Sequence, residues 1–482
     1  MPTKRLSVPA RLAWGTAWLT GCALYVALAM GRWRRWDTSG YDLGIFDQAI
    51  RSYSRFQPPI SSIKGVDYNL FGDHFHPIIA LAAPLYWIWD DPRVLQLAQV
   101  VLVLVAGLLA ARIAGRRMGP HWAQLFGLAF MMASPMQWLI SFDFHEIAFG
   151  LPIIMAMFDA IDRRAPGQVL GFATLLLCVR EDMGLVLFGV GLAMVLSRTM
   201  RSLGAALMVQ GVVGLVVVTR FVIPHFNTSG GFDYWQYPSL GPDLGSALRT
   251  IVTHPLYTAE QFVTPDIKLV TLAALVLPLL AFPLFSWYVI PALLLLGSRF
   301  YASRVELWYP WFHYDAIVWC ILAWSALDVV GRLKGRGRSF LAPVLALAVC
   351  ASIVVSHQEL QHPSPVSMVF DAQWWEVSQR DRNRELAVAL VPPDVCVVAD
   401  MYMMPRFTKT NSVSRNFDQM PDPDYLLVDH ANDGRFPLND GAKLVEEAKR
   451  RNFTNIATYG TIEVWQSPPQ AKREMCVPYY RR

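Results

Sequence analysis

The sequence WDTSGYDLGIFDQAI (residues 36–50) follows the first long apolar run of the chain, and GDHFHP (residues 72–77) follows it after a proline-rich bend. These pieces contain four acids and two histidines, which are Asp37, Asp42, Asp47, Asp73, His74 and His76. Apolar sequence flanks the segment on both sides. Ionisable groups held at a membrane face are costly unless they serve a function. We therefore predict that this segment carries the catalytic base of an enzyme acting on a lipid-linked substrate.

Composition places the chain among polytopic membrane proteins. Of its 482 residues, 54% are hydrophobic and 16% are charged, whereas an ordinary soluble domain has roughly 25% charged residues. The net charge of +5 comes from Lys and Arg that lie mainly between apolar runs, where such residues set membrane orientation. The chain has no glycine-rich phosphate loop, zinc-type Cys/His spacing or basic nucleic-acid module. We therefore expect no nucleic-acid partner.

Eleven apolar runs predict an α-helical membrane domain of about eleven transmembrane helices in residues 1–356. The first run, residues 12–31, has the roughly 20 residues that a span requires, so we predict an uncleaved helix. The other runs lie at residues 94–115, 121–141, 147–161, 168–179, 183–197, 204–224, 268–282, 284–298, 311–331 and 340–356. Residues 77–89 are apolar but short and contain Pro84, which predicts an interfacial or re-entrant helix instead of a span.

The connectors between these runs predict the orientation. Four of them are basic and are expected in the cytoplasm with the N-terminus, at residues 116–119, 162–167, 197–202 and 331–338. Everything after residue 356 then faces outward, as do the loops at residues 32–93, 142–146, 180–182, 225–267 and 299–310. Arg32, Arg34 and Arg35 do not fit this pattern. Either they lie at the headgroup level, where Arg pairs with phosphate, or the orientation of the first helix is reversed.

Residues 357–482 are polar and predict a small α/β domain outside the membrane. Strand-like VCVVAD (395–400) and DYLLVD (424–429) precede a helix-like run at 441–451, and NIATYG and TIEVWQ follow it. No glycine-rich turn follows the strands, so we expect the domain to cap the site or recognise an acceptor instead of binding a nucleotide. Cys396 and Cys476 lie here and either stay reduced or form a disulfide, since the sequence does not give their separation.

Several pieces of the chain resemble a known family. They are YDLGIFDQAI (41–50), GDHFHP (72–77), APLYWIW (83–89), FDFHEIAFGLP (142–152), REDMGL (180–185), WFHYDAIV (311–318), PPDVCVVAD and DYLLVD. With one helix, a long acidic loop, many spans and a C-terminal domain, the chain resembles the GT-C superfamily of polyprenyl-phosphate-sugar-dependent glycosyltransferases. More narrowly, it looks like a bacterial membrane-protein family of unknown function related to these enzymes.

The resemblance implies a multi-pass protein of the bacterial inner membrane. Such an enzyme moves a sugar from a polyprenyl-phosphate donor to a cell-envelope glycan, lipid or protein. An acid of the first outer loop acts as general base, and Asp42 matches that position best. Leu43 stands where the family often has a second acid, so a metal site that depends on an acid pair is incomplete, and a divalent cation is only a possible cofactor.

Chemistry explains the residue types that such a site needs. A carboxylate takes the proton of the attacking hydroxyl, and displacement in one step inverts the anomeric configuration. Cations are needed to stabilise the departing phosphate. Candidates at predicted outer helix ends are Arg180, Arg299, Arg304, His76 and His313.

Alternative roles remain open for these residues. Ser39 and Gly40 favour a turn, in which Asp42 would be a capping or solvated acid. Asp47 is a second candidate for base or metal ligand. Three further groups are left with a functional and a structural interpretation. These are Asp73, His74 and His76 as metal ligands, Asp143, His145 and Glu146 as orienting residues, and Arg180 with Glu181 and Asp182 as a phosphate clamp or a self-neutralising pair.

Two other function classes compete with the glycosyltransferase. A transporter or flippase of lipid-linked sugars is expected to show internal repeats and mid-membrane charges, whereas this chain has no clear repeat and its ionisable clusters gather at one predicted face. A non-catalytic partner would use the outer domain to organise an envelope-assembly complex.

Overall fold

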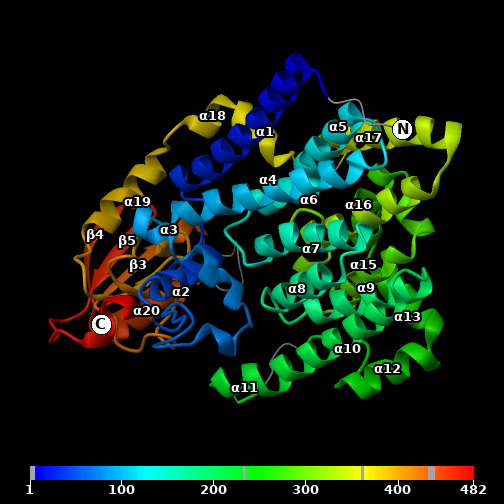
Figure 1. Ribbon diagram of the computed structural model, residues 1–482. Coiled ribbons are helices and arrows are strands. Elements are labelled where there is room, and N and C mark those ends of the chain that lie inside the picture. The colour runs from blue at the N-terminus through cyan, green and yellow to red at the C-terminus, as the bar shows by residue number, and fades with distance from the viewer. Residues whose placement is uncertain (1–5, 229, 232–234, 360–362, 433–439) are drawn as a thin grey trace.

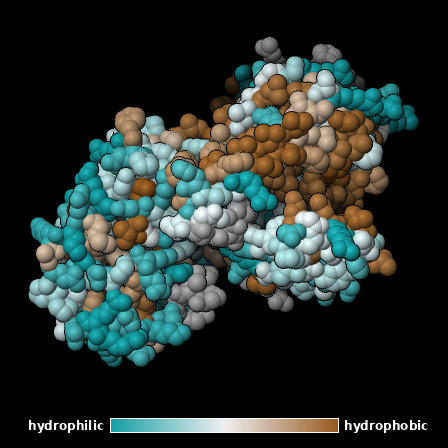
Figure 2. Space-filling view, turned by 90° about the horizontal axis from the view of Figure 1, so that it is seen from below, coloured by the Kyte–Doolittle hydropathy of each residue, from teal (hydrophilic) through white to brown (hydrophobic). Residues whose placement is uncertain are grey.

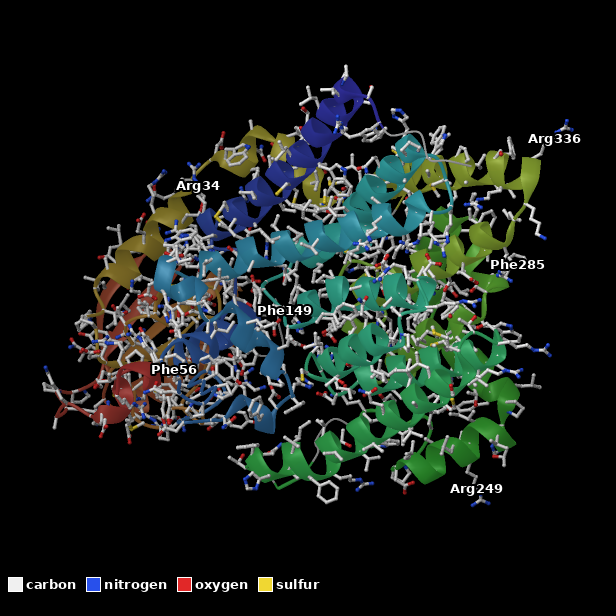
Figure 3. All side chains as sticks on the ribbon, in the orientation of Figure 1. Arg34, Phe56, Phe149, Arg249, Phe285 and Arg336 are labelled. Carbon is white, nitrogen blue, oxygen red and sulfur yellow. A yellow bond between two sulfur atoms is a disulfide. The ribbon has the colours of Figure 1, made fainter. Side chains whose placement is uncertain are left out.

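The computed structural model describes residues 6–228, 230–231, 235–359, 363–432 and 440–482. It contains a bundle of apolar helices and a five-stranded sheet, which lies at one end of the bundle (Figure 1). Arg336, in the first turn of α17 (Gly335–Glu359), marks the far end (Figure 3). The predicted class, a helical membrane protein with a small C-terminal α/β domain, is confirmed.

All eleven predicted apolar runs are helical. The long helices are α1 (Val8–Arg34), α4 (Arg93–Gly115), α10 (Arg201–Val217), which continues as helix to Phe226, and α17 (Gly335–Glu359). The shorter bundle helices are α5 (Pro120–Met132), α6 (Ser134–Ile140), α7 (Ile147–Asp162), α8 (Pro166–Leu177), α9 (Met183–Leu196), α14 (Ile267–Val276), α15 (Ile290–Phe300) and α16 (Asp315–Arg332).

Helix length separates full spans from partial ones. In the described part of the chain, four helices are long and apolar enough to cross a membrane, and six when two bent pairs each count as one span. These pairs are Pro120–Met132 with Ser134–Ile140, bent by 47°, and Pro255–Val263 with Ile267–Leu279, bent by 77°. Helices α8 and α9 have only 12 and 14 residues. The predicted loop at 225–267 also contains α12 (Leu244–Thr253) and α13 (Pro255–Val263).

The surface shows which part of the molecule faces lipid. Figure 2 shows hydrophobic surface gathered over the helical bundle, whereas the lobe at the other side is mainly hydrophilic. On α10, Val209, Val213 and Phe221 are exposed by 63%, 53% and 67%. Large apolar side chains on a helix surface are stable when hydrocarbon replaces water around them.

Glycines bring α9 and α10 into close contact. A methyl group built on Gly184 of α9 would lie 2.6 Å from the carbonyl oxygen of Gly211, and one on Gly204 of α10 would lie 2.7 Å from the carbonyl oxygen of Gly191. Small residues let helix backbones approach closely in membranes, where packing replaces the hydrophobic effect between helices. The two helices are therefore packed backbone to backbone.

The C-terminal sheet has the strand order β2-β1-β3-β5-β4. Its strands are β1 (Cys396–Ala399), β2 (Ser412–Ser414), β3 (Tyr425–Asp429), β4 (Thr454–Tyr459) and β5 (Ile462–Gln466). Strand β1 is parallel to β2 and β3, and β5 is antiparallel to β3 and β4. The predicted strands and the helix α20 (Gly441–Arg450) are confirmed, whereas β2 and α19 (Gln379–Ala389) were not predicted.

Both faces of the central strands are covered. Val398 of β1 and Leu426 of β3 pack in a cluster with Val445 of α20, whereas Val397 and Leu427 belong to the main core on the opposite face. Strands buried on both faces are apolar throughout, which explains why VCVVAD and DYLLVD lack polar alternation. Cys396 of β1 forms a disulfide with Cys476.

The first loop lies against the sheet domain. Its helices are α2 (Ile45–Ser54) and α3 (Leu85–Ile88). The N–H of Gly40 donates to the carbonyl of Met401 at 2.7 Å. The Ser62 hydroxyl donates to the carbonyl of Val413 at 2.9 Å and accepts from its N–H at 3.0 Å. The sheet domain therefore fixes the conformation of the loop at two separate points.

The α9–α10 contact predicts a position-dependent effect of one methyl group. Gly204→Ala places a Cβ against the backbone of α9, so the helices must separate, and overpacking of this kind costs about 1–3 kcal/mol. We expect a melting temperature several degrees lower for the purified protein in detergent.

Gly171→Ala in α8 is the matched control, because a Cβ there meets nothing within 4 Å. Alanine has a higher helix propensity than glycine, so this variant is expected to melt at the same temperature as the native protein or higher. Equal melting temperatures for the two variants would contradict the packing.

Candidate active site

The buried carboxylate of Asp143 joins the end of α1 to the segment that carries Asp42. One oxygen accepts from Arg32 at 3.1 Å, and the other accepts from the N–H and the hydroxyl of Ser39 at 2.7 and 2.9 Å. Asp143 is 3% exposed, and a buried carboxylate is stable only when its oxygens are bonded. Ser39 directly precedes the helical turn Gly40–Gly44, which contains Asp42. Asp143 thereby connects α1 to the segment that carries Asp42, and its orienting role stays a prediction.

Asp42 differs from every other acid of the first loop. The others form ion pairs, which are Asp37 with Arg35, Asp47 with Arg51, Asp67 with Arg482, Asp73 with Lys64, Asp90 with Arg51 and Lys409, and Asp91 with Arg93. The Asp42 side chain is partly exposed and has no hydrogen bond or ion pair to the residues that the structure describes. A carboxylate without a cation keeps its capacity to accept a proton.

The surroundings of Asp42 strengthen it as a base. Partial burial raises the pKa of the Asp42 carboxyl to about 6, and the negative charges of Asp143 and Glu146 act in the same direction. Positive charge on His145 and Arg304 opposes the rise. Near pH 7 the group is therefore mostly ionised, yet it binds a proton more tightly than an ordinary aspartate does.

A charged cluster beside Asp42 lies at the turns before α7 and α9. The Nδ1 atom of His145 lies 2.7 Å from Glu146, and Arg180 lies 3.5 Å from the other oxygen of Glu146. Arg180 also donates to Asp182 at 2.9 Å. Two carboxylates therefore neutralise Arg180, which matches the self-neutralising alternative more closely than a free phosphate clamp. Phe149, labelled in Figure 3, marks the end of α7 that faces the first loop.

Buried imidazoles form one wall of the site. The ring centroids of His145 and His313 lie 4.2 Å apart, and the Phe46 ring meets His145 and His76 at 5.6 and 5.5 Å. His313 is 2% exposed, and neither of its ring nitrogens has a hydrogen-bond partner among the described residues. The same is true of Nδ1 of His76. Unpaired buried polar atoms are costly, so these nitrogens mark positions where a ligand can supply hydrogen bonds.

Among the predicted cations, Arg304 has the weakest ion pair and is the most exposed. Its side chain is 50% exposed, its acidic neighbour lies 3.6 Å away, and it donates to the Tyr314 hydroxyl at 3.0 Å. Arg299 is buried and bonds Asp315 at 2.6 Å and the carbonyl groups of two other residues. Arg299 therefore joins α15 to α16, and its contacts leave it no free side for the phosphate that the sequence assigned to it.

The contacts of Asp47 argue against the base or metal role predicted for it. Asp47 is fully buried, and its two oxygens accept from Arg51 at 2.8 Å and from the Tyr86 hydroxyl at 2.5 Å. Both oxygens are occupied by permanent partners. Asp47 instead holds α2 to α3, because Tyr86 belongs to α3.

Asp73, His74 and His76 do not converge as the predicted metal ligands. Asp73 pairs with Lys64 at 2.9 Å, and His74 pairs with Glu181 at 2.7 Å. Burial alone would lower the pKa of His74, but the Glu181 carboxylate outweighs it and raises that pKa to about 9. A protonated imidazole is a donor and not a metal ligand. Within the described residues, the one group with metal-ligand spacing contains the Cys396–Cys476 disulfide and Asp424.

Sequence reasoning missed three residues of the site. Arg32 entered it only as a cation on the unexpected side, Ser39 only as a turn residue, and Tyr314 only within the piece WFHYDAIV (311–318). Ser39 and Arg32 reach Asp143 across 104 and 111 residues of chain. The one available signal was that Arg32 is a cation at the end of an apolar run, where an unpaired charge is costly.

The fold is similar to solved GT-C glycosyltransferases. The structure of ArnT from Cupriavidus metallidurans bound to undecaprenyl phosphate matches with a TM-score of 0.50 at 12% identity, over 95% of this chain and 99% of that chain. The archaeal oligosaccharyltransferase AglB from Archaeoglobus fulgidus, in complex with an inhibitory peptide and a dolichol-phosphate, matches with a TM-score of 0.47 at 11% identity, over 96% and 75%. No curated protein sequence gives a significant match. The ArnT likeness establishes a GT-C-type fold.

A family model covers most of the chain. Residues 33–463 match it, and this range includes nearly all of the first loop, the bundle helices after α1 and the strands β1 to β4. The protein therefore belongs to the family described as "Predicted membrane protein (DUF2079)".

Proposed function

We propose that this protein is a membrane glycosyltransferase that moves a sugar from a polyprenyl-phosphate donor to a cell-envelope acceptor, with Asp42 as general base. The observation that carries the proposal is the unpaired state of Asp42, in a loop whose other acids all have cationic partners. The GT-C-type fold supports the reaction class. ArnT holds undecaprenyl phosphate in its structure, which supports a lipid of this kind as donor here.

The reaction follows from the chemistry of these groups. An acceptor hydroxyl oxygen attacks the anomeric carbon, and its proton moves to the Asp42 carboxylate. The bond from the anomeric carbon to the phosphate oxygen breaks, and its electron pair stays on the polyprenyl phosphate. Displacement in one step inverts the anomeric configuration. Arg304 can stabilise the charge that develops on the phosphate, because it is exposed and weakly paired.

The orientation is part of the proposal. We place the N-terminus in the cytoplasm and the sheet domain outside the inner membrane of a bacterium. The Cys396–Cys476 disulfide supports this side, because disulfides persist in oxidising compartments and are rare in the cytosol. The basic connectors at the far end of the bundle support it independently.

Asp42→Asn is the decisive variant. The amide keeps the shape of the side chain but cannot take a proton, and general-base catalysis contributes roughly 10²–10⁴-fold. We expect at least that loss in the release of polyprenyl phosphate from glucosyl, mannosyl and arabinofuranosyl donors, measured by mass spectrometry in nanodiscs. The melting temperature should not fall, because the neutral amide avoids the cost of burying a charge.

Asp67→Asn is the matched control on the same loop. Its carboxylate pairs with Arg482 and is 49% exposed, so this variant is expected to keep the native rate. If the Asp42→Asn variant transferred sugar at the native rate, Asp42 would not be the general base. A transporter or a non-catalytic partner would release no polyprenyl phosphate with the native protein either.

The pKa of Asp42 sets the pH dependence of the rate. Since the carboxylate form is the active one and its pKa is about 6, the rate should be near its plateau at pH 7 and fall about tenfold per pH unit well below the pKa. An ordinary aspartate would keep the rate constant down to about pH 4. A profile that is flat from pH 7 to pH 5 would contradict the assignment.

The disulfide tests the side of the membrane on which the sheet domain lies. The protein is made in cells, denatured, and then labelled with maleimide-polyethylene glycol. Cys396 and Cys476 should react with the label only after reduction. The four free cysteines, Cys22, Cys178, Cys320 and Cys350, should react in both samples. A reductant-independent shift of all six would place the domain in the cytoplasm. Cys396→Ser with Cys476→Ser is the control and should lose the reductant-dependent part.

A further inference from the structure

A cavity of about 470 Å³ lies at the C-terminal end of α1, apart from the histidine wall. It is bounded by the end of α1, by Ser141 after α6, and by the segment that contains α18 (Ala372–Trp375). None of the residues assigned to the chemistry of Asp42 lines it except Arg32. The cavity therefore needs an explanation of its own.

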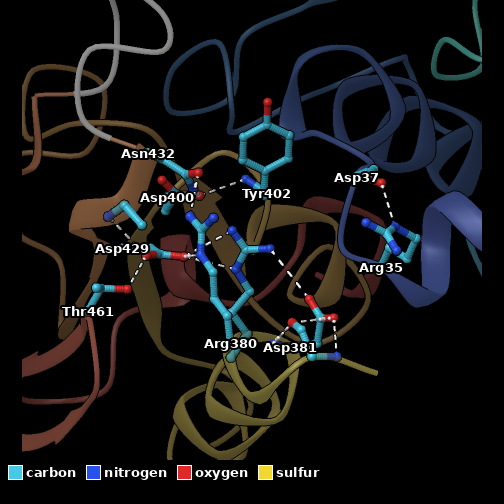
Figure 4. A network of polar contacts seen from close by, with 12 residues as sticks. Arg35, Asp37, Arg380, Asp381, Asp400, Tyr402, Asp429, Asn432 and Thr461 are labelled. Carbon is cyan, nitrogen blue, oxygen red and sulfur yellow. Dashed lines mark hydrogen bonds and ion pairs between the residues drawn. The ribbon is translucent and has the colours of Figure 1, made fainter. Parts of the chain in front are cut away.

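Both hydrogen-bond donors and acceptors line the cavity. Arg35 donates to the carbonyl of Gln373 at 2.7 Å and lies 3.5 Å from Asp37. The side chains of Arg35 and Asp37 are 35% and 46% exposed, and Figure 4 shows the two together beside the polar network of the sheet domain. Asp371 adds a second carboxylate to the lining. Both polar partners are therefore open to a ligand.

This lining suits a neutral, hydroxyl-rich group better than an anion. The lining has no excess positive charge, because Arg32 is paired with Asp143, Arg35 lies beside Asp37, and Asp371 adds a further carboxylate. A phosphate would meet carboxylates as well as guanidinium groups. A hydroxyl group both donates and accepts, so a sugar or polyol can bond to Arg35, Asp37 and Asp371.

Trp374 and Met368 form the apolar part of the cavity. Trp374 lines it, and the Arg35 guanidinium lies 5.2 Å from the centroid of the Trp374 ring. The ring packs so closely on α1 that a Cβ added to Gly31 would lie 2.8 Å from its Cζ2 atom. Met368 lies beside it in the lining. An aromatic wall of this kind offers the ring of a sugar a fixed surface, since aromatic faces contact apolar C–H groups favourably.

The position of the cavity indicates a lipid. It lies at the end of α1, a helix of membrane-spanning length whose Leu19 is 72% exposed. Acyl chains can therefore lie along α1 while the headgroup enters the cavity. Arg32 links the cavity to the site, because it bonds Asp143, which holds the segment that carries Asp42.

We propose that this cavity binds the sugar or polyol headgroup of a glycolipid, and that such a glycolipid is the acceptor. The assignment as acceptor rests on the proposed glycosyltransferase function, whereas the binding does not. The cavity volume is sufficient for a headgroup and leaves the chains outside.

Binding of two lipids with the same acyl chains tests the proposal. The full-length protein in nanodiscs is titrated with monoglucosyldiacylglycerol and with phosphatidic acid. Asp37→Asn removes a charged acceptor, so it should weaken binding of the glucosyl lipid about tenfold. It should not weaken the binding of phosphatidic acid, because the substitution also removes a carboxylate that repels the phosphate. Ser141→Leu, which fills part of the cavity, should also weaken the binding of the glucosyl lipid.

The control variants separate this proposal from the transferase. Asp67→Asn should bind the glucosyl lipid as the native protein does. Asp42→Asn should also keep this binding, so a failure of sugar transfer leaves the measurement intact. Unchanged glucosyl-lipid binding in both Asp37→Asn and Ser141→Leu would overturn the proposal, as would tighter native binding of phosphatidic acid than of the glucosyl lipid.

Discussion

The site depends on one buried ion pair, that between Arg32 and Asp143. Breaking such a pair by removing one partner costs about 3–5 kcal/mol, because the other charge stays buried. Here the pair also receives two hydrogen bonds from Ser39. It therefore ties together the end of α1, the turn before α7 and the start of the segment that contains Asp42. Both oxygens of Asp143 accept hydrogen bonds, and the bonds from Ser39 fix the position of the segment that carries the unpaired Asp42.

The sheet domain holds the same segment from the other side. Gly40 donates to Met401, and a Cβ on Gly40 would collide with the side chain of Met404. Met401 and Met404 follow β1, close to the polar network of Figure 4. In that network Arg380 and Arg384 bond the buried Asp429 at the end of β3. Interactions at the ends of the parallel strands thus hold the chain after β1. This chain in turn holds the first loop through the hydrogen bond between Met401 and Gly40.

The sequence predicts what depends on local pattern. Apolar runs locate the bundle helices except α12 and α13, and unbroken apolar pieces locate β1 and β3, because these signals arise from neighbours in the chain. Partners are a different matter. Asp47 meets Tyr86 across 39 residues and Arg299 meets Asp315 across 16, so both looked as free as Asp42 and Arg304. The choice among seven similar acids of the loop required the positions of their cations, which only the folded chain supplies.

Asp42 stays basic although several cations lie near it. A free guanidinium close by would hold the pKa of a carboxyl down. Arg180 lies in the same cluster, but Glu146 and Asp182 neutralise it, and it is not among the main influences on the pKa of Asp42. The negative charges of Asp143 and Glu146 raise the pKa of Asp42, and the positive charges of His145 and Arg304 lower it. With the neighbouring charges opposed, burial becomes the largest influence, so position in the fold, and not one dedicated partner, makes Asp42 a base suited to neutral pH.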